Sequence, residues 1–143
     1  MGPPKQFEDL DVWQAAEGLA VEIGRLSRDG PLAKDYGLRD QLQTAALDLM
    51  GAIAGGHEQG DRSEFLHSLR VAKGLAARVR SLVHVAKDLG YLTDPQRSGL
   101  LERLTSVARQ LGGFIRYLEK GPPSGPPKPD FVNEPAAPRR AGR

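Results

Sequence analysis

Cysteine is absent from the 143-residue sequence, which excludes disulfides, thiolate metal sites and cysteine nucleophiles. Long apolar runs are absent too, because no stretch approaches the ~18 residues that a membrane-spanning helix needs. The first ten residues, MGPPKQFEDL, lack the apolar core of a secretory signal peptide. We therefore expect a soluble, cytoplasmic protein, and its length is typical of a single domain.

Proline is scarce in the central part of the chain. Between residues 7 and 120 only Pro31 and Pro95 occur, each where a helix is expected to begin. Residues 121–143 instead contain 10 prolines and glycines among 23 residues. We expect a short polar lead at 1–6, a helical domain at 7–120 and a flexible Pro/Gly-rich tail at 121–143. A ligand for a proline-recognising module is the alternative interpretation of the tail.

Apolar residues recur at steps of three and four in four segments, whereas the alternation typical of strands is nowhere sustained. The segments are about 10–26, 38–55, 62–89 and 93–118. The fourth begins with Thr93-Asp94-Pro95-Gln96, a predicted capping box, and Gly90 is placed to end the third. Gly51 and Gly74 are expected at close helix contacts. Short loops favour an antiparallel, up-down-up-down four-helix bundle.

Several stretches resemble the bacterial four-helix-bundle proteins encoded by intervening sequences in 23S ribosomal RNA genes. They are Phe7-Glu8-Asp9-Leu10-Asp11-Val12-Trp13-Gln14-Ala15, Tyr36-Gly37-Leu38 with Gln41 and Ala45-Ala46, Glu64-Phe65-Leu66, Val71-Ala72-Lys73-Gly74 and Leu89-Gly90-Tyr91-Leu92. The similarity covers about residues 7–118. Accessory variability determinant proteins of diversity-generating retroelements share the fold.

The resemblance implies a homo-oligomer, often a five-subunit ring, without enzymatic activity and with a suspected link to nucleic acid. It also admits a protein partner such as a reverse transcriptase. Departures concern polar residues: Gln43-Thr44 replaces a usual pair of arginines, and Ala52-Ile53-Ala54-Gly55-Gly56 replaces Asn-Ile-Ala-Glu-Gly. Leu75 and Arg78 replace a serine and a glutamate. The apolar pattern is kept, so packing specificity and partner binding are the properties affected.

Charge is divided between the two halves of the domain. Residues 1–61 carry 5 basic and 11 acidic side chains, whereas residues 62–120 carry 11 basic and 5 acidic ones. At ~100° per residue, one arc of the third helix gathers six basic side chains, the basic stripe: Arg62, Arg70, Lys73, Arg80, His84 and Lys87. The stripe is a candidate site for RNA or DNA phosphates. Pairing with the acidic first and second helices, within the chain or in a neighbouring subunit, is the alternative.

The first helix is apolar on more than one side. Trp13 lies at about 80–100° from the centre of the apolar face, and Leu10 and Val21 lie further round. A broad core face accounts for this pattern, and so does a subunit interface, in which aromatic residues are enriched. The resemblance favours Leu10, Trp13 and Val21 as an oligomer interface.

Residues that could carry catalysis form no recognisable constellation. Glu64-x-x-His67 has a spacing found in di-iron bundles, but such centres need two of these pairs and further glutamates. We therefore expect no catalytic or metal site, no cofactor and no enzymatic activity. Two functions stay open: association with nucleic acid through the third and fourth helices, and a protein-interaction scaffold whose ring or tail recruits a protein.

Overall fold

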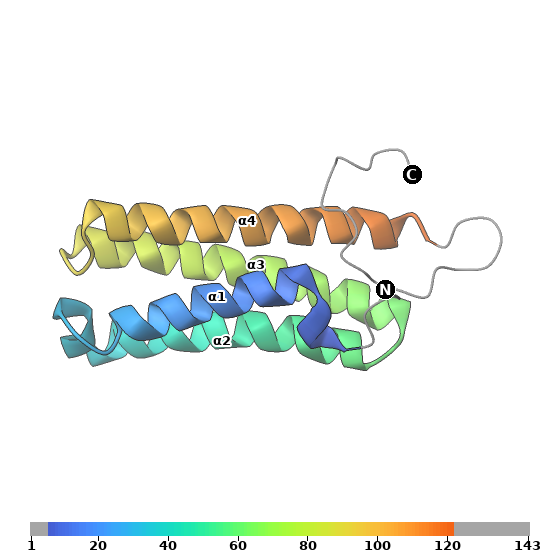
Figure 1. Ribbon diagram of the computed structural model, residues 1–143, viewed down its shortest axis with the longest axis horizontal. Helices are drawn as coiled ribbons and strands as arrows, with labels where there is room; N and C mark the ends of the chain where they lie inside the picture. The colour runs from blue at the N-terminus through green and yellow to red at the C-terminus, as the bar shows by residue number, and fades with distance from the viewer. Residues whose placement is uncertain (1–5, 122–143) are drawn as a thin grey trace.

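The computed structural model describes residues 6–121, and within this part every regular element is helical (Figure 1). Four long helices are present: α1 Asp11–Leu26, α2 Tyr36–Glu58, α3 Arg62–Asp88 and α4 Asp94–Glu119. Two short 3₁₀ turns, η1 Phe7–Asp9 and η2 Pro31–Lys34, precede α1 and α2. The prediction of an all-α chain with four helices is confirmed. The predicted lead and tail lie, apart from Gln6 and Gly121, outside the described residues.

Side-chain caps fix where three of the helices begin. Asp35 and Asp61 each accept a hydrogen bond from the backbone amide three residues further on, at 3.1 and 2.9 Å. The capping box at α4 is confirmed: Thr93 accepts from the Gln96 amide at 3.2 Å, and the Gln96 side chain accepts from the Thr93 amide at 2.9 Å. A cap of this kind stabilises a helix by ~1 kcal/mol.

Glycines with positive φ turn the chain between helices. Gly30, Gly60 and Gly90 have φ values of 82°, 71° and 84°, a region that residues with a Cβ rarely adopt. The prediction that Gly90 ends the third helix is confirmed. In Figure 1 the helices lie along one long axis, with the α1–α2 and α3–α4 loops at one end and the α2–α3 loop at the other.

The core runs along the centre of this arrangement and receives side chains from all four helices. Their spacing of three and four places them on one face of each helix. The largest fully buried side chains are Phe65, Leu10, Leu19, Ile23, Leu32, Leu42, Leu49, Ile53, Leu69, Leu100, Leu104 and Leu111. Burying one such side chain contributes ~1.5–3 kcal/mol, so the apolar pattern of the sequence accounts for the fold.

The glycines of α2 and α3 do not behave as the sequence suggests. α2 continues through Gly55 and Gly56 to Glu58, although its predicted end is residue 55. A Cβ at Gly56 would lie 2.4 Å from Ser68 Cβ, whereas a Cβ at Gly51 or Gly74 would meet nothing within 4 Å. The expectation of close contacts at Gly51 and Gly74 is wrong. Gly56 is the glycine that lets α2 and α3 approach.

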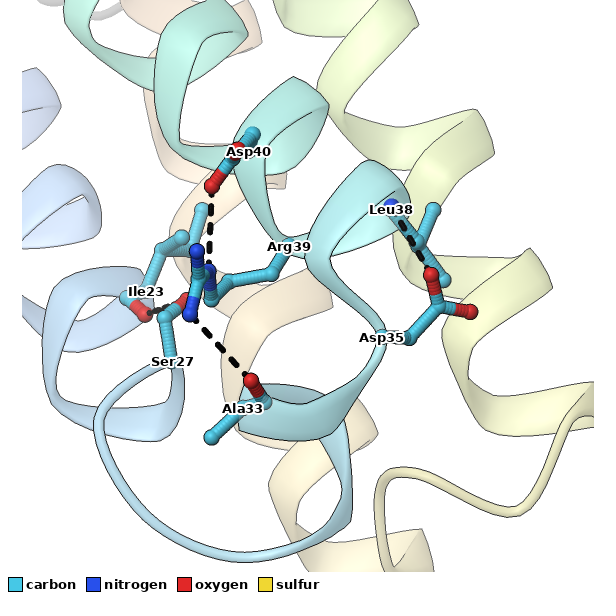
Figure 2. A network of polar contacts seen from close by, with 7 residues as sticks. All are labelled: Ile23, Ser27, Ala33, Asp35, Leu38, Arg39 and Asp40. Carbon is cyan, nitrogen blue, oxygen red and sulfur yellow. Dashed lines mark hydrogen bonds and ion pairs between the residues drawn. The ribbon is translucent and has the colours of Figure 1, made fainter.

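Polar contacts hold the corner between α1 and α2 (Figure 2). Ser27 is buried, and its hydroxyl donates to the Ile23 carbonyl at 2.7 Å. Arg39 on α2 donates through Nη1 to the Ala33 carbonyl of η2 at 3.2 Å and through Nε to Asp40 at 3.0 Å. The Arg39–Ala33 bond connects η2 to the first turn of α2, and the Ser27–Ile23 bond lies at the end of α1.

Candidate nucleic-acid interface

The basic stripe lies on the side of α3 that borders α4. At the start of α3, Arg62 donates weakly to the Leu118 carbonyl at 3.5 Å, and its guanidinium lies 5.8 Å from the Tyr117 ring centroid. Arg70 forms an ion pair with Glu119 at the end of α4. At the other end of the stripe, Lys87 Nζ lies 3.1 Å from Asp94 Oδ1, at the first residue of α4. Three members of the stripe are therefore engaged with α4.

The centre of the stripe is different. Lys73, Arg80 and His84 are exposed, and none of them forms an ion pair with another residue in the described part of the chain. Lys73 and Arg80 are seven residues apart, which at ~1.5 Å per residue separates them by ~10.5 Å along the helix axis. Lys73 and Arg80 therefore present their positive charges to solvent, and no acidic side chain among the described residues pairs with either of them.

Pairing of the stripe with the acidic first and second helices does not take place within the described part of the chain. The ion pairs that the stripe forms there are with Glu119 and Asp94, both on α4. The polar contact from α3 to α2 involves Arg78, which is outside the stripe, and the neutral side chain of Gln41, at 3.0 Å. Arg78 is one of the residues at which the sequence departs from the family that it resembles, since a glutamate is usual there.

Two further arginines on α4 are exposed, and they were not among the residues predicted from the sequence. Arg109 and Arg116 are exposed and, like Lys73 and Arg80, stand seven residues apart. At ~100° per residue, both lie within about 80° of Glu119, the residue that pairs with Arg70 on α3. The seven-residue spacing of like charges was the signal in the sequence that could have identified them.

The three candidate interface residues of α1 do not form one surface. Leu10 is 0% exposed and belongs to the core, so its assignment to an interface is wrong. Leu10 occupies the N-cap position of α1, where its backbone is extended, with φ −77° and ψ 129°. The direction of its side chain therefore cannot be calculated from the ~100° per residue of a helix. Trp13 is half-buried, with its ring 5.2 Å from that of Phe7, whereas Val21 is 45% exposed. Of these three residues, Val21 is the freely exposed apolar side chain.

Other exposed apolar side chains lie on α2 and α3, where the spacing of apolar residues does not indicate an interface. Leu47 on α2 is 59% exposed, and Val71 and Val85 on α3 are also exposed. On α3 the two valines lie within about 40° of each other and about 100° or more from Lys73 and Arg80, at ~100° per residue. Apolar and basic exposed residues therefore occupy separate arcs of this helix.

His57, near the end of α2, is a titratable group that burial affects. Its ring lies edge-on to Phe65, with 5.7 Å between the ring centroids. Burial lowers the pKa of His57 from its usual 6.5, and the nearby carboxylates of Glu58, Asp9 and Glu8 oppose this effect. His57 lies outside the basic stripe.

The Glu64-x-x-His67 spacing gathers no further ligand-type side chains among the described residues. Glu64 and His67 are both exposed at the start of α3, and no group of three or more His, Asp or Glu side chains between residues 6 and 121 could hold a metal ion. No described helix is both long and apolar enough to cross a membrane.

Comparison with known proteins bears on this basic, four-helix chain. No curated protein matches it. The model of one protein family, described as 23S rRNA-intervening sequence protein, matches residues 8–113, which include α1 to α3 and most of α4. Because this match covers well over half of the sequence and agrees with the four helices, the chain belongs to the 23S rRNA-intervening sequence protein family.

Proposed function

We propose that this protein is a non-enzymatic, oligomeric four-helix bundle that binds the phosphate backbone of RNA or DNA through α3 and α4. The observation that carries the proposal is the exposed set Lys73, Arg80 and His84, which forms no ion pair within the described residues. Arg109 and Arg116 add cationic groups on the neighbouring helix. Such groups neutralise phosphates and release counterions, which makes binding salt-dependent.

The chemistry of this surface favours contacts with the backbone over contacts with bases. Positively charged side chains on phosphates position a protein on nucleic acid but do not distinguish sequences. Sequence-tolerant binding of unpaired strands relies on exposed aromatic rings that stack on bases. No aromatic residue belongs to the stripe, and Tyr117, the aromatic residue beside it, lies under Arg62.

An antiparallel, up-down-up-down order of the helices is part of the proposal. The Arg62–Leu118 contact brings the start of α3 to the end of α4, and the Lys87–Asp94 pair lies at the opposite ends of the same helices. The alternating positions of the loops in Figure 1 support the same order for the remaining helices. In this order α3 and α4 are antiparallel neighbours, joined by contacts near both ends.

Assembly into a ring, with five subunits as the family resemblance implies, is the second part of the proposal. Val21 and half-buried Trp13 supply apolar surface on α1. Light scattering on the purified protein is expected to give a defined oligomer, and a 15.5 kDa monomer would contradict this part.

The nucleic-acid part is tested by removing two central charges, Lys73→Gln with Arg80→Gln. Anisotropy of labelled RNA and DNA is measured over a range of salt concentrations. If both residues contact phosphates, the slope of log affinity against log salt falls by ~1.8 for duplex DNA and ~1.4 for a single strand. Arg25→Gln with Arg28→Gln is the matched control, since it removes two exposed charges at the end of α1. Equal effects of the two double variants, or no binding at low salt, would contradict the proposal.

A protein-interaction scaffold is the second candidate function, and the exposed Leu47, Val71 and Val85 favour it. These residues would provide the apolar centre of a protein interface, with charged residues at its rim. Sedimentation of the same variants distinguishes contacts of the stripe with phosphates from contacts of the stripe with another subunit. Loss of the oligomer in the Lys73→Gln, Arg80→Gln variant, with no binding of RNA or DNA by the unmodified protein, is the result expected if the stripe contacts another subunit.

A further inference from the structure

A hollow of about 790 Å³ lies at the end of the bundle where the α1–α2 and α3–α4 loops meet. Pro31, Tyr36 and Tyr91 provide its ring-bearing side chains. Lys34 and Asp35 provide its two charged groups, and glycines complete the lining. Neither Lys73 nor Arg80 lines the hollow, and the proposed binding of nucleic acid makes no use of it.

The two tyrosines of the hollow are held by specific contacts. The Tyr91 hydroxyl donates to Asp35 Oδ2 at 2.9 Å, while the other carboxylate oxygen of Asp35 caps α2. The Arg39 guanidinium stacks at 4.8 Å from the Tyr36 ring centroid, yet Tyr36 remains 67% exposed. Aromatic rings that line a groove are one feature by which proteins bind extended, proline-rich segments, and here Tyr36 is exposed while Tyr91 is half-buried.

The chain itself contains such a segment after the last described residue. α4 has 26 residues and, at ~1.5 Å each, separates Gly121 from the hollow by ~39 Å. Proline-rich chain in its extended helix advances ~3.1 Å per residue, so about 13 residues are needed to return along the bundle. Pro135 and Pro138 are the prolines that lie far enough from Gly121. The earlier proline cluster at 122–129 spans only ~25 Å and does not reach the hollow of its own chain.

Charged residues of both signs flank these two prolines, and the hollow also carries both signs. Glu134 precedes Pro135, and Arg139 and Arg140 follow Pro138, whereas the hollow carries one lysine and one aspartate. We propose that residues 134–140 dock in the hollow of the same chain, with the prolines on Tyr36 and Tyr91 and the flanking charges near Lys34 and Asp35.

Disulfide trapping tests the docking, and the absence of native cysteine makes the trap specific. The full chain carries Gly37→Cys, in the hollow, together with Ala137→Cys, between the two prolines. A Cβ at position 37 meets only Asp35 Oδ1, at 3.9 Å, so the fold tolerates it. The matched control pairs Ala137→Cys with Gly51→Cys, an exposed position of the same helix with nothing within 4 Å. Position 51 lies further along α2 from the hollow than position 37 does. A tail that does not dock in the hollow is therefore not expected to form a disulfide with residue 37 faster than with residue 51.

Docking raises the local concentration of residue 137 at the hollow, so the 37–137 disulfide is expected to form at least ~10-fold faster than the 51–137 disulfide. Gel mobility is expected to show that the bond joins residues of one chain. Pro135→Ala with Pro138→Ala, or Tyr36→Ala, is expected to reduce the rate to that of the control, with helicity checked by circular dichroism. Equal rates for the two pairs, no effect of these substitutions, or a bond only between chains would overturn the proposal.

Discussion

Gly56→Ala tests the close approach of α2 to α3. The new Cβ would lie 2.4 Å from Ser68 Cβ, 2.7 Å from Ser68 Oγ and 3.1 Å from Phe65 Cδ1. Carbon atoms pack best at ~3.5–4.0 Å, so the overlap with Ser68 Cβ exceeds about 1 Å, and Cβ moves only with the backbone. Overpacking of this kind costs ~1–3 kcal/mol, and an overlap with an immobile atom belongs at the upper end of that range.

Gly55→Ala is the control, because it makes the same chemical change one residue earlier, where nothing lies within 4 Å. Both variants gain the same helix propensity, so their difference isolates packing. We expect Gly56→Ala to be less stable than Gly55→Ala by ~2–3 kcal/mol in urea unfolding at one fixed protein concentration. Adding Ser68→Gly removes both Ser68 atoms and is expected to restore part of the loss as a favourable coupling energy. Equal stability of the two alanine variants would refute the reasoning.

Three further outcomes are expected. Burial lowers the pKa of His57 below 6.5 in the folded protein, so the unfolded protein binds more protons at this residue. The contribution of His57 to stability is therefore fully present above pH 6.5 and is lost as pH falls below that value. Urea unfolding at several pH values should show a smaller decrease in His57→Gln, and identical profiles would contradict this. Thr93→Ala removes the capping box and should cost ~1 kcal/mol in thermal unfolding, unlike Thr105→Ala at an exposed interior position of α4. Deleting residues 122–143 should leave helicity nearly unchanged, because α4 ends at Glu119, before this segment, and a large loss of helicity in circular dichroism would contradict that view.

The helices could be predicted from the sequence because their spacing directly encodes a buried face. In α4, Leu100, Leu104, Val107 and Leu111 recur at three and four residues, and all are buried. The start of α4 was equally predictable, since a threonine with glutamine three residues later makes local hydrogen bonds that need no tertiary contact. Features decided within one helical turn can thus be inferred from local pattern.

Contacts between helices could not be predicted in this way. Helical spacing shows which face a glycine occupies but not how near the neighbouring backbone lies, and this distance distinguishes Gly56 from Gly51 and Gly74. Leu10 was misplaced because its extended backbone invalidates an angle calculated for a helix. The stripe on α3 could be located from spacing, but the engagement of Arg70 and Lys87 with α4 depends on where helix ends meet.

The connection between α2 and α3 bears on how the chain folds. Only residues 59–61 separate these helices, so their contacts are local in sequence and closing the loop costs little chain entropy. α1 and α4 meet across most of the domain, where the Arg103 side chain reaches Gly18. We therefore expect the α2–α3 hairpin to form early in folding, and hydrogen exchange of the amides along its seam tests this expectation.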